Sequence, residues 1–159
     1  MDTIKSKAEG YLAALGYNGK LRNQWPQTVS SLKAVLDQLV IDFPDLKLQV
    51  MDFMPVANNI NIHLPDSVNI INGETNRWFN GRLVFLLLTN GWVSAEIFYP
   101  NSEGTKSKSE GLGIFQQSQV TTARIYDLFE MFLEKMSLSV KGDSETAVGV
   151  VCNEPLKEN

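Results

Sequence analysis

Residues 82–99 read RLVFLLLTNGWVSAEIFY and contain the run LVFLLL at positions 83–88, six large apolar residues in succession. A membrane-spanning helix needs about 20 predominantly apolar residues, so this run is too short to be an anchor. Asn90-Gly91 follows closely, and this dipeptide suits a two-residue hairpin turn because both central positions of that turn need a positive φ. The stretch therefore predicts a β-hairpin with strands over 82–88 and 92–99.

A two-residue turn at Asn90-Gly91 determines which side chains of the hairpin share a face. One face is nearly all apolar and pairs Leu88 with Val93, Leu86 with Ala95, Val84 with Ile97 and Arg82 with Tyr99. The opposite face pairs Leu87 with Ser94, Phe85 with Glu96 and Leu83 with Phe98, and a tight turn at Asn80-Gly81 adds Trp78 to it. We expect helices to bury the first face. Three different partners are considered for burial of the second face: the N-terminal helix, a second copy of the chain, or a partner protein.

The sheet is expected to continue on the N-terminal side of this hairpin. Segments 46–54, 59–64 and 68–71 alternate apolar and polar residues and are separated by Pro, Asn and Asp. Another Asn-Gly pair, Asn72-Gly73, indicates a further tight turn. Together these signals predict an antiparallel meander of about five strands, paired mainly between neighbours in sequence.

Helical periodicity flanks this strand-forming region. Apolar residues recur at intervals of three and four over about 28–43, where Pro44 ends the pattern, and again over about 118–136. A shorter helix is expected over about 3–15. The predicted fold class is therefore α+β, an antiparallel β-meander of about five strands with two long amphipathic helices, one before and one after the sheet, packed on one face.

The whole chain, 1–159, is expected to form one domain, because we find no internal repeat and no linker that divides it. Residues 101–113, NSEGTKSKSEGLG, are small, polar and rich in glycine, which predicts a flexible surface loop. Residues 137–159 are expected to form a polar tail, in which AVGVVC at 147–152 could add an edge strand.

Charge and cysteine content restrict the functional classes. The chain has 14 Lys and Arg against 18 Asp and Glu, a formal net charge of -4, whereas nucleic acids and anionic membranes bind basic surfaces. We therefore expect no nucleic-acid partner and no membrane partner. The single cysteine, Cys152, excludes an intramolecular disulfide and a paired-cysteine zinc site. Together with a start that lacks a signal-peptide core, it favours a cytoplasmic protein.

Residues with catalytic chemistry are few and scattered. His63, the only histidine, lies three residues before Asp66, but no second histidine or thiol is near in sequence to complete a metal site or a catalytic pair. Cys152 lies near the C-terminus and would need His63 as its base. Segment 104–113 mixes Gly, Lys and Ser without the order of a phosphate-binding loop. No catalytic residue, metal site or cofactor is predicted, and a non-enzymatic protein is favoured.

Two features indicate contact with another molecule. NRWFNGR at 76–82 places two arginines beside Trp78 and Phe79, a grouping that is enriched at the centres of protein interfaces. Glu96 lies on the second hairpin face, where burial would raise its pKa and suit proton transfer, whereas an open face would leave it an ordinary surface residue. The predicted partner-binding residues are Arg77, Trp78, Phe79, Arg82, Trp92 and Glu96.

These observations predict a protein-binding module of the adaptor, chaperone or inhibitor type, which uses a sheet face or edge to bind a partner protein or to form a homodimer. In size, acidic charge and helix-sheet character the chain is similar to small bacterial secretion chaperones and toxin-immunity proteins, a similarity of class and not of residues. The alternative is a small enzyme or ligand-binding protein with a pocket between sheet and helix, whose polar groups would be Glu96, His63, Arg77 and Tyr99.

Overall fold

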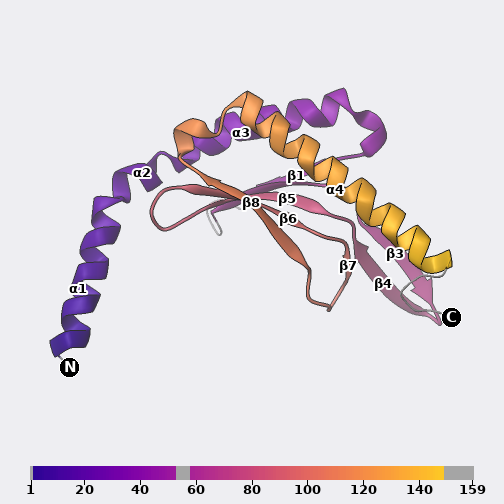
Figure 1. Cartoon of the computed structure of the whole chain (residues 1–159), viewed down its shortest axis with the longest axis horizontal. Helices are drawn as coiled ribbons and strands as arrows, with labels where there is room; N and C mark the ends of the chain where they lie inside the picture. Colours follow the sequence, from indigo (N-terminus) through magenta and orange to yellow (C-terminus); the bar gives the residue numbers. More distant parts are fainter. Residues whose placement is uncertain (1, 53–57, 149–159) are drawn as a thin grey trace.

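The computed structural model describes residues 2–52 and 58–148, in which a layer of helices lies over one face of an antiparallel sheet (Figure 1). The helices are α1 (Asp2–Tyr17), α2 (Gly19–Asn23), α3 (Trp25–Asp42) and α4 (Thr122–Val148), with short 3-10 helices η1 (Pro44–Leu46) and η2 (Gln117–Gln119). The strands are β1 (Gln49–Asp52), β2 (Asn59–His63), β3 (Ser67–Ile71), β4 (Glu74–Phe79), β5 (Arg82–Leu87), β6 (Val93–Phe98), β7 (Asn101–Ser102) and β8 (Ser109–Phe115). The predicted α+β class, with long helices before and after the sheet, is confirmed.

The strands form two antiparallel sheets. The larger has the order β1-β2-β5-β6-β8, and the smaller has the order β3-β4-β7. The β3–β4 hairpin leaves the larger sheet between β2 and β5, so β2 pairs with β5 although two strands separate them in the chain. The predicted meander of about five strands becomes eight strands in two sheets: predicted strand 68–71 is β3 of the smaller sheet, and the larger sheet gains β8, which was expected as part of a loop.

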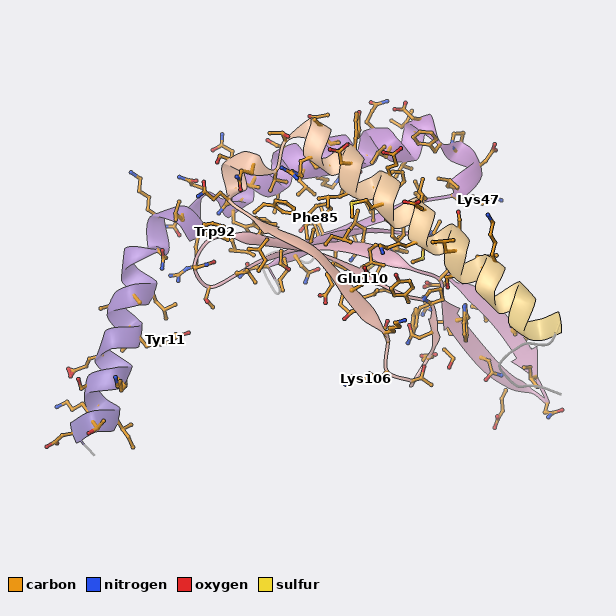
Figure 2. All side chains as sticks on the ribbon, viewed as in Figure 1. Tyr11, Lys47, Phe85, Trp92, Lys106 and Glu110 are labelled. Atoms are coloured by element: carbon orange, nitrogen blue, oxygen red, sulfur yellow. The ribbon has the colours of Figure 1, made fainter. Side chains whose placement is uncertain are left out.

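The core lies between the larger sheet and the helices α3 and α4, which both cover the same face (Figure 1). Phe85 lies in this layer, beneath the helices (Figure 2). Fully buried large side chains contribute about 1.5 to 3 kcal/mol each, so this layer supplies most of the stability. Its fully buried members are Trp25, Leu32 and Leu36 of α3, Ile60 and Ile62 of β2, Leu83 and Phe85 of β5, Val93 and Ile97 of β6, and Ile125 and Phe132 of α4.

The loop between β5 and β6 holds three residues, not the two that were predicted. The backbone N–H of Leu88 donates to the carbonyl of Trp92 (2.8 Å), and the N–H of Gly91 donates to the carbonyl of Leu88 (3.0 Å). Gly91 has a φ of 85°, whereas Asn90 is not among the residues with a positive φ. This is the geometry of a type I turn followed by one left-handed residue, the usual three-residue hairpin loop.

The longer loop shifts the pairing of β5 with β6 by one residue, and the predicted register is therefore wrong. Because side chains alternate along a strand, a shift of one residue exchanges the two faces of β5. Leu83 and Phe85 face the helices, whereas Val84 and Leu86 lie on the opposite, open face with Glu96. The observed pairs are Leu87 with Val93, Leu86 with Ser94, Phe85 with Ala95, Val84 with Glu96, Leu83 with Ile97 and Arg82 with Phe98.

Two segments predicted to be irregular are regular. Residues 101–113, expected as a flexible loop, contain β7 and most of β8, and β8 pairs with β6 along its length. A register shift in this pairing near Ala95 and Glu96, and two glycines in SEGLGIF, hide the alternation that identifies a strand. The predicted tail begins as helix, because α4 continues to Val148. Residues 149–152 of the suggested edge strand, and 53–54 of the predicted strand 46–54, lie outside the described residues.

The N-terminal helix does not cover the second face of the sheet. α1 projects away from the body of the molecule and is followed directly by α2 (Figure 1). Its apolar side chains are largely exposed, and Leu12 retains 64% of its accessible surface. The chain's own N-terminal helix is therefore excluded as the element that buries the second face.

Candidate functional site

Three of the six predicted partner-binding residues form a cluster where the two sheets meet. Arg77 lies on β4 and Arg82 begins β5, and the guanidinium carbon of each stands 5.4 Å from the centre of the Phe79 ring. Nη2 of Arg77 also lies 3.0 Å from Oδ2 of Asp66. Each cation over the ring contributes about 0.5 to 1 kcal/mol at an exposed position, so Phe79 and Asp66 hold the two arginines in place.

The other three predicted residues lie elsewhere. Trp78 is adjacent to Phe79 on β4, so it faces the opposite side of the smaller sheet, where 40% of it is exposed. Trp92 follows the end of β5 and lines a pocket beside α2, at the opposite end of the larger sheet from Arg82. Glu96 lies on the open face of that sheet, beside Val84. The six residues therefore do not form one continuous surface.

A pocket of about 390 Å³ adjoins the arginine cluster on the open face of the larger sheet. One guanidinium, three amides and a hydroxyl supply its polar groups, and the described residues that line it include no carboxylate. Such a lining suits a polar or anionic molecule. The lining residues are Asn59, Asn61, Phe79, Arg82, Val84, Phe98, Asn101 and Ser107.

His63 is buried on the same face of the sheet and has a hydrogen-bond partner at each ring nitrogen. Nδ1 lies 3.0 Å from Oδ1 of Asn61, and Nε2 lies 3.2 Å from Oε1 of Gln49. Burial, followed by the positive charge of Arg82, lowers the pKa of His63 below its ordinary value of 6.5. A neutral ring donates from one nitrogen only, so the tautomer decides which of the two amide oxygens accepts the hydrogen bond. The contact with Gln49 links β2 to β1, whereas the contact with Asn61 lies within β2.

Tyr99 and Glu110 form a second polar network, on the helix side of the sheet. The hydroxyl of Tyr99 donates to Oε1 of Glu110 (2.7 Å), and Oε2 of Glu110 lies 2.9 Å from Nζ of Lys135 on α4. The hydrogen bond from Tyr99, and then that from Lys135, lowers the pKa of Glu110, while the same bonds raise the pKa values of Tyr99 and Lys135. This network links β8 to α4.

The four polar groups proposed for a pocket between sheet and helix are not brought together. His63 and Glu96 lie two strands apart on the open face and are offset by two residues along them, which separates them by about 12 Å at the usual strand spacing and rise. Arg77 belongs to the smaller sheet, and Tyr99 is bonded to Glu110 on the helix side. None of the four lines the pocket beside Arg82. The structure therefore assembles no catalytic group from these residues.

Gln117 is a central residue that the sequence did not identify. Its Nε2 donates to the carbonyls of Leu21 (2.6 Å) and Gly91 (2.9 Å), and its Oε1 accepts from Oγ1 of Thr28 (2.5 Å). One amide thus connects α2, α3 and the β5–β6 loop. No local sequence signal marks it, because its three partners are 26 to 96 residues away in the chain.

The β3–β4 hairpin is an exposed arm, residues 67–79, that extends beyond the larger sheet (Figure 1). All five residues of β3 are exposed, and Ile70 retains 76% of its accessible surface. Alternation places Val68 and Ile70 on one face of the arm, and Ile71 on the other face with Trp78. Within residues 2–52 and 58–148, β3 pairs with β4 alone, so its second edge is open.

The described part of the chain also bears on metal binding and on membrane insertion. Within it, no three His, Cys, Asp or Glu side chains are grouped so as to hold a metal ion. None of its helices is long and apolar enough to cross a membrane. Cys152 lies outside the described residues, so no geometry bears on its proposed pairing with His63.

Comparison with protein-family models, with curated proteins and with solved structures finds no significant match to this chain. Its function is therefore inferred from its own residues and geometry.

Proposed function

We propose that this protein is a non-enzymatic protein-binding module and that the arm, residues 67–79, binds the partner. The observation that supports this is β3, which places five exposed residues, three of them large and apolar, along an open sheet edge. An open edge offers unpaired backbone N–H and C=O groups to another strand. Natural proteins usually protect such an edge with lysine, proline or a bulge, but β3 reads SVNII.

The partner that fits this arm is an extended, apolar segment of another protein. A strand paired with β3 would satisfy its free backbone groups, which is the mode of recognition called β-strand addition. Side chains of that segment would cover Val68 and Ile70 on one face and Ile71 and Trp78 on the other. Burial of each such side chain contributes about 1.5 to 3 kcal/mol, enough in sum for specific binding.

The test compares two isoleucine variants in affinity capture from the native cell extract. Ile70→Lys places a charge on the arm, and Ile41→Lys makes the same change on α3, where Ile41 is 68% exposed. Because both side chains are exposed, neither change should alter folding by more than about 0.5 kcal/mol. We expect a protein that is retained by the wild type and by Ile41→Lys to be lost with Ile70→Lys. Equal retention by all three would contradict a role for the arm.

A second candidate function is the binding of a small anionic ligand in the pocket beside Arg82. It is favoured by the lining of that pocket, which contains a guanidinium, three amides and a hydroxyl. Titration calorimetry with small carboxylates and phosphate should then detect binding that weakens at least about tenfold in Arg82→Gln. Arg124→Gln is the matched control, because Arg124 also stacks on an aromatic ring, that of Phe115, at 4.9 Å. A wild type that binds none of these probes would remove this candidate.

A further inference from the structure

α1 has an apolar stripe that its own chain leaves in solvent. At about 100° per residue, one arc of roughly 100° contains Ile4, Ala8, Tyr11, Leu12 and Leu15. Ile4, Tyr11 and Leu12 are exposed, and Tyr11 lies on a helix that stands clear of the sheet (Figure 2). Isolated helices of this length are only marginally stable in water, and most helices are stabilised by packing of their apolar face. The stripe therefore indicates a docking partner.

Basic side chains border this stripe on both sides. Lys5 lies about 20° beyond Leu12 at one margin, and Lys7 lies about 40° beyond Tyr11 at the other. Neither lysine has an ion-pair partner among the residues that the structure describes. The surface that receives α1 should accordingly be apolar at its centre and acidic at its rim.

A groove with these properties lies between the end of α3 and the first half of α4. It has a volume of about 400 Å³ and an apolar floor in which the Phe43 and Phe129 rings stand 6.4 Å apart. Its rim carries the carboxylates of Asp42, Asp127 and Glu130, and the described residues that line it include no basic side chain. Asp127 and Glu130 have no ion-pair partner in the described chain.

We propose that this groove binds α1 of a second copy of the chain. The apolar stripe then covers the groove floor, and Lys5 and Lys7 approach the acidic rim, so that shape and charge both match. The stripe from Ile4 to Leu15 spans about 16 Å, compared with about 10 Å along α4 from Tyr126 to Leu133, so the groove receives most of the stripe.

The donor of the helix is a second copy because α1 is poorly placed to reach its own groove. It precedes α3, whereas the groove lies at the other end of α3, about 21 Å farther on when measured from Trp25 to Leu39. α1 also points away from that end (Figure 1). In a dimer with two-fold symmetry each copy provides one helix and one groove, which doubles the contact. This interface does not include the arm.

The first test measures molar mass by light scattering and sedimentation at about 100 µM chain, well above the dissociation constant of a specific dimer. The wild type should have twice the mass of one chain. Leu12→Glu, which places a charge within the stripe, should be monomeric. Ala13→Glu adds the same charge on the opposite side of α1 and should remain dimeric. A monomeric wild type, or a dimeric Leu12→Glu variant, would overturn the proposal.

The second test reverses the charges on both surfaces. The double variants Lys5→Glu with Lys7→Glu, and Asp127→Lys with Glu130→Lys, should each weaken the dimer by at least about tenfold. The variant with all four changes should recover the dimer, because opposite charges again face one another. Failure of the fourfold variant to recover would exclude this pairing of surfaces. Slow hydrogen exchange in α1 of a monomer would indicate docking within one chain instead, and would also overturn the proposal.

Discussion

The β3–β4 and β5–β6 hairpins both turn at Asn-Gly, yet their loops differ. In the arm, Asn72 and Gly73 have φ values of 53° and 79°, and Ile71 pairs with Glu74, which defines a two-residue turn. In β5–β6 the positive φ is confined to Gly91, and the loop holds three residues. The same dipeptide thus permits two loop lengths, and the surroundings decide between them.

The surroundings of the two loops differ in their contacts. Nη1 of Arg22 donates to the carbonyl of Thr89 (3.1 Å), and Nε2 of Gln117 donates to the carbonyl of Gly91 (2.9 Å). The tip of the arm is exposed at each of its residues, 71–74. A register shift in β5 would exchange core and surface side chains, whereas a shift in the arm would exchange one exposed face for another. The β5–β6 hairpin is therefore held by tertiary contacts, and the arm is held by its turn.

The largest expected difference between the two hairpins is in the free energy of unfolding after side-chain truncation. Phe85→Ala removes a fully buried ring of β5 and should lower the free energy of unfolding by about 3 to 5 kcal/mol. Ile70→Ala on the arm should change it by no more than about 0.5 kcal/mol. Urea unfolding followed by circular dichroism measures both. Similar losses in the two variants would show that the arm is part of the stabilising core.

The next largest difference is expected at the two glycines with positive φ. An added Cβ at Gly91 would lie 2.6 Å from Cβ of Leu21, so Gly91→Ala combines backbone strain with a clash and should lower the free energy of unfolding by about 2 to 4 kcal/mol. A Cβ added at Gly73 would meet no atom within 4 Å apart from its chain neighbours, so Gly73→Ala should lower the free energy of unfolding only by the backbone strain, about 1 to 2 kcal/mol. Thermal unfolding of both variants measures this order, and a reversed order would refute the contact between α2 and the loop.

A smaller loss of stability is expected when the hydrogen bonds between Gln117 and the β5–β6 loop are removed. Gln117→Ala removes hydrogen bonds to Leu21, Gly91 and Thr28, and should lower the free energy of unfolding by about 1 to 3 kcal/mol. The exposed neighbour Ser118 is the control, because Ser118→Ala should have an effect below about 0.5 kcal/mol. Amide exchange in the β5–β6 loop should accelerate in Gln117→Ala and remain slow in Ser118→Ala. Unchanged exchange would mean that the loop does not depend on this amide.

The smallest effect is the contribution of His63 to the pH dependence of the free energy of unfolding. His63 lies beside Arg82, the first residue of β5. Its pKa in the folded chain is below the unfolded value of 6.5, because burial and Arg82 disfavour the charged ring. The unfolded chain therefore binds more protons, and this contribution to stability is present above about pH 6.5 and is lost as the pH falls through the folded pKa. The free energy of unfolding, measured between pH 5 and 7.5, should rise with pH in the wild type, and this rise should disappear in His63→Gln. An unchanged slope in that variant would assign the dependence to other groups.

The secondary structure was predictable where burial of one side of a helix or strand produces a regular spacing of apolar residues. Leu32, Leu36 and Leu39 recur at helical spacing because one side of α3 is buried, and that spacing can be read without knowledge of the partner surface. α3 begins at Trp25, earlier than predicted, because Pro26 belongs in the first turn of a helix. β8 was missed because its glycines interrupt the alternation.

The candidate site was predictable only in part. The proximity of Arg77, Phe79 and Arg82 follows from their closeness in sequence. Glu96 was placed opposite Phe85 by an incorrect register, and Trp92 lies beside α2, away from the cluster. Asn80-Gly81 does not form a hairpin, because β4 and β5 belong to different sheets and the amide of Asn80 donates to the carbonyl of Pro65 (2.6 Å). The exposure of SVNII could not be predicted, since a strand with this composition is equally compatible with a core.

The sequence by itself determined the fold class, the positions of the long helices and the existence of both hairpins, because these depend on periodicity and on the backbone preferences of proline, asparagine and glycine. The tertiary structure alone decided the register of LVFLLL, the departure of the arm from the larger sheet and the exposure of α1. Each of these depends on contacts between residues distant in sequence, such as Gln117 with Gly91, or on which apolar surface is left without a cover. A run of apolar residues specifies that burial is favourable, and only the folded arrangement specifies what provides it.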